Sequence, residues 1–536
     1  MQPFGSLVLA LTVLAPLALP APARAADVAL MAGQRARPLN GTFNSVPVLH
    51  SNQPEEVEGP GILISTTPGV AYAAENGRPL PNAEYSFNGA FGLHLHHKYF
   101  PTYRRQIQPG QRRTELTLGV ILINPGRVPV SIRFERGAVR NSFQAPYLAN
   151  HLLGVKPLGP RPWNTGPGDA TAVQMLREQL DRDLSEVVVI PPRSRIVLFR
   201  TPLPALGIAN ALLRGRSNGP FQMAVVAASN PQSDADLIAV LDNRRLAPGR
   251  VYLNRVGDIQ ARRVFSRVGG VAIGDTYHAE VRHDLRRDGP LHVPLTSTSR
   301  HHFGTQEVQV NPLAVRMLDS SLDNVGTYGV RFDVDLKLEG SGSYDLVLSH
   351  PRVSAGRKEF VAFRGSLQVR TPDGLQEMHL GMRSGESHAL TSLVLQPGTP
   401  LPVTVSLVYP ADATPGHLLS VVPSSQLAMV QARQRLQPSV PAPAPAPAPA
   451  AARPPAGGGL PVAPPPPLLE PAQQRPGTVT ARPLLQLQPR TQPDAPAHQP
   501  ARRPPAQAAG VNPSLLLRYQ EAMEAQQQLM RGLVGP

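Results

Sequence analysis

Hydrophobic and polar residues alternate along several stretches of the chain, and the clearest of these runs from Leu116 to Phe134. Leucine and valine occupy every second position of its first half, and Val130, Ile132 and Phe134 repeat the pattern in its second half. Side chains alternate between the two faces of a strand, so this spacing predicts two strands. Proline and glycine in Asn124-Pro125-Gly126-Arg127 favour a turn between them. The sequence therefore predicts a β-hairpin here.

The second half of the chain repeats this layout. Residues 328–338 alternate apolar and charged side chains and lead through a Gly-Ser-Gly turn into residues 344–348. Each of the two predicted hairpins is followed by a strand pair around a Pro-containing turn, at residues 187–199 and 393–407. The layout predicts an all-β fold with two β-sandwich-like units, residues 40–250 and 260–425.

One short helix is expected inside the first unit. Asp169 follows a Gly-Pro-Gly turn and is a good N-cap residue. Val173, Leu176 and Leu180 then recur at helical spacing. These signals predict a helix from Ala170 to about Arg182 whose apolar side faces the core.

The composition changes near Pro438. Prolines, of which the chain has 62, are concentrated in residues 438–512, together with many alanines. Such a segment cannot bury enough apolar surface to offset the entropy of ordering it, so it is predicted to be a disordered Pro/Ala-rich linker. Residues 513–534 carry apolar side chains at helical spacing, which predicts a short amphipathic C-terminal helix. Its apolar side suggests a protein partner.

The N-terminus predicts export. Residues 7–19 form an apolar run, and Ala23-Arg24-Ala25 has the small-x-small pattern of a cleavage site after Ala25. Residues 1–25 are therefore predicted to be a signal peptide, and the mature protein is expected to be periplasmic or extracellular. No later stretch is apolar for the roughly 18 residues of a membrane span, so no transmembrane segment is expected.

The charge of the chain suggests its class of partner. It has 52 Lys and Arg against 37 Asp and Glu, a formal net charge of +15, and no cysteine. A basic protein attracts polyanions. Because export disfavours nucleic acid, the expected partner is an anionic glycan or the cell wall; the alternative is a solvated Arg-rich surface without a partner. Without disulfides, the fold must depend on its apolar core.

Two residue pairs are candidates for binding. His94 and His96 lie two positions apart on a predicted strand, where both imidazoles face one side, as two metal ligands would; the alternative is a hydrogen-bonded surface pair. Trp163 lies beside Arg161 in a Pro/Gly-rich loop, where the ring could stack on a sugar and the guanidinium could meet an acidic group. The alternative is that Trp163 fills a gap at the edge of the sandwich.

Catalytic motifs are weak. Gly215-Arg216-Ser217-Asn218-Gly219 matches the G-x-S-x-G pattern of a hydrolase nucleophile, which requires a turn from a strand into a helix. The next residues, 221–226, have the composition of a strand, so we expect a β-turn and assign no catalytic residue and no cofactor. Glu55, Glu56 and Glu58 are expected to lie in a solvated loop.

A set of short motifs resembles a known family. In chain order these motifs are Asn44-Ser45-Val46-Pro47-Val48, the predicted Leu118 to Val130 hairpin with its Asn-Pro-Gly turn, Gly166-Pro167-Gly168, Arg216-Ser217-Asn218-Gly219-Pro220, Arg267-Val268-Gly269-Gly270-Val271-Ala272, Gly326-Thr327-Tyr328-Gly329-Val330 and Tyr409-Pro410-Ala411-Asp412-Ala413-Thr414-Pro415. From about residue 40 to 425 the chain resembles the cyanobacterial family catalogued as domain of unknown function 3370. The resemblance implies an exported protein of a photosynthetic bacterium, and it implies no activity.

Two functions are compatible with these patterns. The first is an exported, non-enzymatic cell-envelope protein, structural or adhesive, that binds anionic polysaccharide or the cell wall. The second is a carbohydrate-active hydrolase that uses paired carboxylates in a β-sandwich cleft.

Overall fold

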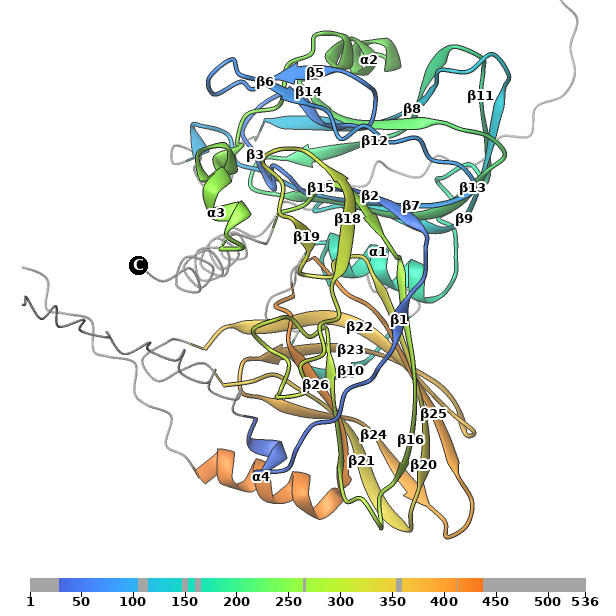
Figure 1. Cartoon of the computed structure of the whole chain (residues 1–536), viewed down its shortest axis with the longest axis vertical. Coiled ribbons are helices and arrows are strands. Elements are labelled where there is room, and N and C mark those ends of the chain that lie inside the picture. Colours follow the sequence, from blue (N-terminus) through green and yellow to red (C-terminus); the bar gives the residue numbers. More distant parts are fainter. Residues whose placement is uncertain are drawn as a thin grey trace, which may run out of the picture. The chain divides into compact units, whose positions relative to one another are not determined.

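The computed structural model shows a protein built mainly of strands, which confirms the predicted all-β class (Figure 1). The structure describes residues 28–104, 114–146, 153–159, 165–263, 267–352, 359–411 and 413–436. The predicted signal peptide, the Pro/Ala-rich linker and the C-terminal helix at 513–534 lie outside these ranges. None of the helices in the described ranges has the length and apolar composition that a bilayer crossing requires.

The first sandwich consists of a nine-stranded and a four-stranded sheet around one hydrophobic core. The larger sheet contains, in spatial order, β11 (Val187–Ile190), β9 (Val130–Asn141), β13 (Ile208–Ser217), β7 (Ala90–Tyr99), β2 (Pro47–Ser51), β15 (Gly269–Ile273), β18 (Asn311–Arg316) and β19 (Asp323–Asn324), with β3 (Glu56–Val57) also paired to β7. The smaller sheet contains β12 (Ser194–Pro204), β8 (Glu115–Asn124), β14 (Gln222–Ala228) and β4 (Gly61–Ser65).

The second sandwich has the same two-sheet construction and a core of its own. Its seven-stranded sheet contains β1 (Thr42–Phe43), β16 (Thr276–Asp284), β20 (Arg331–Glu339), β25 (Leu401–Val408), β22 (Val361–Thr371), β23 (Gly374–Arg383) and β10 (Gly154–Pro157). Its four-stranded sheet contains β17 (Leu291–Leu295), β26 (His417–Pro423), β21 (Gly342–Ser349) and β24 (Ser387–Leu395). A separate two-stranded sheet joins β5 (Val70–Tyr72) to β6 (Pro79–Pro81).

Helices are short and few in the described ranges. They are α1 (Pro167–Leu176), α2 (Asp234–Asp242), α3 (Val256–Gln260) and α4 (Ser424–Leu436), with 3-10 turns η1 (Ala29–Met31) and η4 (Val251–Arg255). Helix α2 packs on β14 and β12 and covers the outer side of β8, where the side chain of Leu237 lies against Gly119. This cover explains why β8 is apolar on both faces.

The predicted hairpin at residues 116–134 is wrong, because β8 and β9 belong to opposite sheets. β8 pairs with β12 and β14, whereas β9 pairs with β11 and β13. The chain therefore crosses between the sheets after β8 and crosses back between β11 and β12. The second sandwich repeats both crossings, from β20 to β21 and from β24 to β25. The repeated layout in the sequence thus corresponds, in each sandwich, to two neighbouring connections that cross from one sheet to the other.

The Asn124 side chain forms hydrogen bonds to both segments that cross between the sheets of the first sandwich. Its side-chain nitrogen donates to the carbonyls of Val128 (2.8 Å), Ile190 (3.1 Å) and Pro191 (3.1 Å), and its side-chain oxygen accepts from the backbone N–H of Gly126 at 2.9 Å. A Pro-Gly turn determines only the local direction of the chain. Packing in the core and these hydrogen bonds determine which strands pair.

Strand pairing also crosses the expected boundary between the two units. β15 and β18, from the second half of the sequence, extend the larger sheet of the first sandwich beside β2. β1 and β10, from the first half, form the two edges of the seven-stranded sheet. Helix α1 contacts β9 and β13 of the first sandwich and β22 and β25 of the second, so it lies between them (Figure 1). The two sandwiches are therefore tied together by exchanged strands and a shared helix.

Replacing Asn124 tests the crossing. Asn124→Ala should lower the free energy of unfolding by about 2–3 kcal/mol, because each lost hydrogen bond contributes about 1 kcal/mol and the carbonyls are left unpaired. Urea denaturation of the variant and of Asn76→Ala, which removes an exposed turn asparagine, measures the difference. Equal losses for the two variants would contradict the role given to Asn124.

Candidate functional site

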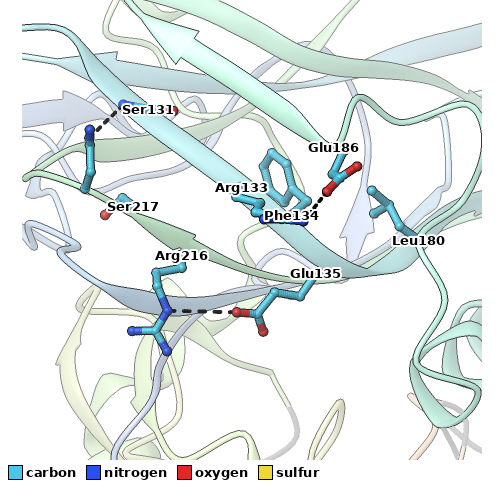
Figure 2. A pocket seen from close by; sticks show the side chains of 9 residues that line it. Ser131, Arg133, Phe134, Glu135, Leu180, Glu186, Arg216 and Ser217 are labelled. Carbon is cyan, nitrogen blue, oxygen red and sulfur yellow. Dashed lines mark hydrogen bonds and ion pairs between the residues drawn. The ribbon is translucent and has the colours of Figure 1, made fainter.

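A shallow cavity of about 750 Å³ lies on the outer face of the nine-stranded sheet, over β9 and β13 (Figure 2). It is lined by Phe134 and Leu180 and by the polar residues Ser131, Arg133, Glu135, Glu186, Arg216, Ser217 and Asn218. The burial of β9 explains this composition, because its odd positions from 131 to 135 face outward while its even positions enter the core.

The charged side chains of the cavity form two solvent-exposed ion pairs. Arg133 Nη2 lies 2.7 Å from Glu186 Oε1, and Arg216 Nε lies 4.0 Å from Glu135 Oε1 (Figure 2). The side chains of Arg133 and Arg216 are 71 % and 64 % exposed. Exposed ion pairs contribute only about 0–1 kcal/mol, since water screens them. An external anion can therefore compete for either arginine at little cost.

A β-bulge directs charged residues toward this face. The pairing of β9 with β13 shifts between Arg214 and Gly215, which leaves Glu135 without a register partner. As a result, the consecutive residues Glu135 and Arg136 both contact charged side chains. Glu135 lies near Arg214 and Arg216, and Arg136 pairs with Glu178. Bulges commonly re-aim a side chain in this way. No signal in the sequence predicted this bulge.

Ser217 lies at the rim of the cavity and is not built as a hydrolase nucleophile. β13 ends at Ser217 and the next element is the strand β14, as the sequence predicted. The buried Ser217 hydroxyl accepts a hydrogen bond from the backbone N–H of Gly89 at 3.1 Å. Its environment is therefore that of a structural residue at the end of a strand.

The predicted pair His94 and His96 is buried in the nine-stranded sheet and is hydrogen-bonded. The Nδ1 atoms of His94 and His50 are 3.1 Å apart, so one donates to the other. The amide nitrogen of Asn210 donates to His96 Nδ1 at 2.9 Å, and its oxygen accepts from Thr171 on α1 at 2.6 Å. Among the described residues, no group of three or more His, Asp, Glu or Cys is arranged to hold a metal. Metal binding by His94 and His96 stays a prediction.

Burial keeps several of these histidines neutral. It lowers the pKa of His50 and that of His97 to about 3 each. The pKa of His94 is lowered well below its ordinary value by burial and by the neighbouring His50, His96 and His97. His97 lies on the other face, where its imidazole bonds Ser51 and the carbonyl of Pro54.

Helix α1 connects this cluster to the second sandwich. The helix begins at Pro167 and ends at Leu176, earlier than predicted, and Asp169 lies in its first turn rather than at the N-cap. The carboxylate of Asp169 accepts hydrogen bonds from Ser366 (2.9 Å) and His379 (3.0 Å). These distant partners, which the local sequence does not show, hold the carboxylate away from the helix end.

The acidic loop at residues 55–58 is also different from the expectation. Glu55 is not solvated, since its carboxylate pairs with the buried Lys98 at 2.7 Å and with Arg267 at 3.7 Å. Burial alone raises the pKa of Glu55, but Lys98 and Arg267 outweigh burial and hold that pKa at about 2. Trp163 and Arg161, the predicted sugar-binding pair, lie outside the described residues, as does the predicted cleavage site at Ala25.

The comparison with known proteins identifies a family without an activity. The family described as "Protein of unknown function (DUF3370)" matches residues 34–423. No curated protein matches the chain. Two solved structures of oxalate decarboxylase variants from Bacillus subtilis are 10 % and 8 % identical, each covering 74 % of this chain and 85 % of its own, with a TM-score of 0.08. A third is 9 % identical, covers 69 % and 85 %, and has a TM-score of 0.09. Scores this low carry no argument about fold or chemistry.

The buried histidines predict loss of stability in acid. Below pH 6.5 the unfolded chain protonates an imidazole that the fold keeps neutral down to about pH 3, as for His50, so the unfolded state binds more protons. Stability should therefore fall as the pH decreases from about 6.5, by up to about 1.4 kcal/mol per pH unit for each such histidine. Urea denaturation between pH 7 and pH 4 should show a shallower fall in His50→Asn. A slope unchanged in that variant would contradict this assignment.

Proposed function

Because the chain belongs to the DUF3370 family of proteins of unknown function, its function has to be argued from its own residues, and we propose a non-enzymatic cell-envelope protein. Its cavity over β9 and β13 binds an anionic polysaccharide of the envelope or the cell wall. The net charge of +15 supports a polyanionic partner. The resemblance to cyanobacterial proteins suggests that the source is a photosynthetic bacterium.

The observation that carries this proposal is the register of two arginines. Arg133 and Arg216 are direct partners across β9 and β13, and both line the cavity. Like charges directly opposite each other on neighbouring strands repel. An anion placed between the two guanidiniums removes that repulsion and accepts charge-assisted hydrogen bonds, to which a planar guanidinium is well suited.

The other polar groups of the cavity suit a sugar. Asn218 Oδ1 accepts the backbone N–H of Ser131 at 2.8 Å, so its amide nitrogen can donate to a hydroxyl group. Glu135 and Glu186 supply acceptors for further hydroxyls. A carboxylated sugar fits this mixture better than a simple anion does, because it offers both a negative charge and hydroxyl groups.

One observation favours a second function. Glu135 and Glu186 line the same cavity, and a hydrolase of glycosides uses two carboxyl groups about 5–10 Å apart. Each of them, however, is ion-paired to an arginine. We therefore keep a carbohydrate-active hydrolase as the alternative.

Export is part of the same proposal. The apolar run at residues 7–19 and the Ala-Arg-Ala pattern before Ala26 support a cleaved signal peptide. In an exporting bacterium the periplasmic or secreted protein should begin at Ala26. N-terminal sequencing of the protein from each cell fraction tests this, and an uncleaved protein confined to the cytoplasm would contradict it.

Binding is tested with polygalacturonate, a carboxylated polysaccharide, and neutral dextran as control. The mature protein should bind polygalacturonate, and Arg133→Gln or Arg216→Gln should each weaken binding about fivefold through loss of a charge-assisted hydrogen bond. Arg287→Gln is the matched control, because Arg287 is 76 % exposed and paired with Asp288 away from the cavity. Added salt should weaken binding to the unchanged protein. Equal losses for the three variants would refute a site at the cavity.

The carboxylates separate the two functions. Glu135→Gln and Glu186→Gln each remove an internal competitor for an arginine, so a binding protein should bind polygalacturonate more tightly after either change. A hydrolase should instead release reducing ends from the polymer, and either substitution should abolish that release. Reducing-end release by the unchanged protein that both variants lack would overturn the binding proposal.

A further inference from the structure

We infer that the anion site continues from the cavity to the junction of the two sandwiches, where the carboxylate of Glu178 occupies the position of a ligand's anion. The ligand class is a linear polyanion with repeated carboxylate or sulfate groups. This inference rests on the proposed function of the cavity and extends it by a second, distinct anion position.

Glu178 binds two arginines from different sandwiches. Arg136 Nη1 on β9 lies 3.0 Å from Glu178 Oε1, and Arg331 Nη1 on β20 lies 3.2 Å from the same oxygen. The two guanidiniums therefore converge on one point, as they would on one oxygen of a bound carboxylate or sulfate.

Arg136 lies near two other arginines and has a donor that Glu178 does not use. The pKa of Arg136 is lowered by burial and by the nearby Arg214 and Arg331. Arg136 Nε is buried and makes no hydrogen bond within the described part of the chain. This unused donor favours a further anionic group.

The Glu178 carboxylate is placed so that it can be displaced. Its side chain is 62 % exposed, whereas those of Arg136 and Arg331 are 18 % and 17 % exposed. Glu178 follows α1 and has a left-handed backbone conformation with φ 55°. Its side chain can therefore swing into water while the helix and both arginines keep their positions.

Glu135 connects this position to the cavity. It lies 3.4 Å from Arg214 and 4.0 Å from Arg216. Arg214 also pairs with Asp275 and is the register partner of Arg136. Charged side chains thus run without interruption from Arg216, through Arg214, to Arg136. A linear polyanion that displaces Glu135 can follow these arginines along this face of the sheet.

The test uses sulfate as a small probe and polygalacturonate as a long one. Thermal unfolding of the mature protein is followed in sodium sulfate and in sodium chloride of equal ionic strength. Glu178→Gln removes the carboxylate that pairs with Nη1 of Arg136 and of Arg331, while Arg331 keeps its ion pair with Asp333. Sulfate should therefore raise the melting temperature of this variant more than that of the unchanged protein. The variant should also bind polygalacturonate about fivefold more tightly. Asp373→Asn is the matched control, because it removes one negative charge from an exposed turn residue.

The double variant Glu178→Gln/Arg331→Gln shows whether the larger effect of sulfate arises at the Glu178 position. It should lose the additional effect of sulfate and return to the response of the unchanged protein. The inference is overturned if Glu178→Gln behaves like Asp373→Asn, or if the gain persists in the double variant. Failure of polygalacturonate to bind the unchanged protein defeats the proposed function instead, and the sulfate experiment then still decides whether the Glu178 position accepts an anion.

Discussion

The rest of the structure depends on the burial of helix α1 between the two sandwiches. Buried polar side chains destabilise a fold unless they are hydrogen-bonded. Hydrogen bonds are made on both sides of the helix, where Asp169 Oδ2 accepts from Ser366 and His379 and Thr171 bonds Asn210, while Asp169 Oδ1 has no hydrogen-bond partner in the described part of the chain. Its apolar residues share a small cluster with Leu212 of the first sandwich and Val408 of the second. These contacts fix how the larger sheets of the two sandwiches meet.

The position of the proposed anion sites follows from that helix and from the sheet beneath it. The helix ends just before Glu178, which places this carboxylate beside Arg136 and Arg331. The bulge at Glu135 turns charged side chains of β9 toward the same surface. The arginines thus sit on rigid strands, while the carboxylates that pair with them at the cavity and at Glu178 are largely exposed. A surface of this kind binds polyanions with little rearrangement of the backbone.

Much of the fold could be predicted from local patterns, because period-two alternation depends only on neighbouring residues. It located the strands around Asn124 and the two-sandwich architecture. It could not show which strands pair, since Pro125 and Gly126 allow the chain either to fold back in one sheet or to cross to the other. The local sequence also could not show that Glu55 pairs with Lys98 or that Asp169 bonds His379, because those partners are distant along the chain.

The candidate site was less predictable than the fold. The spacing of His94 and His96 in the sequence is that of two possible metal ligands, and the structure places both in a buried hydrogen-bonded cluster. Arg133 and Arg216 carry no motif and become a site only through strand register. The most direct measurement is a crystal structure of the mature protein with a galacturonate oligomer. We expect sugar carboxylates within hydrogen-bond distance of Arg133 and Arg216. An oligomer bound elsewhere, with neither arginine in contact, would contradict it.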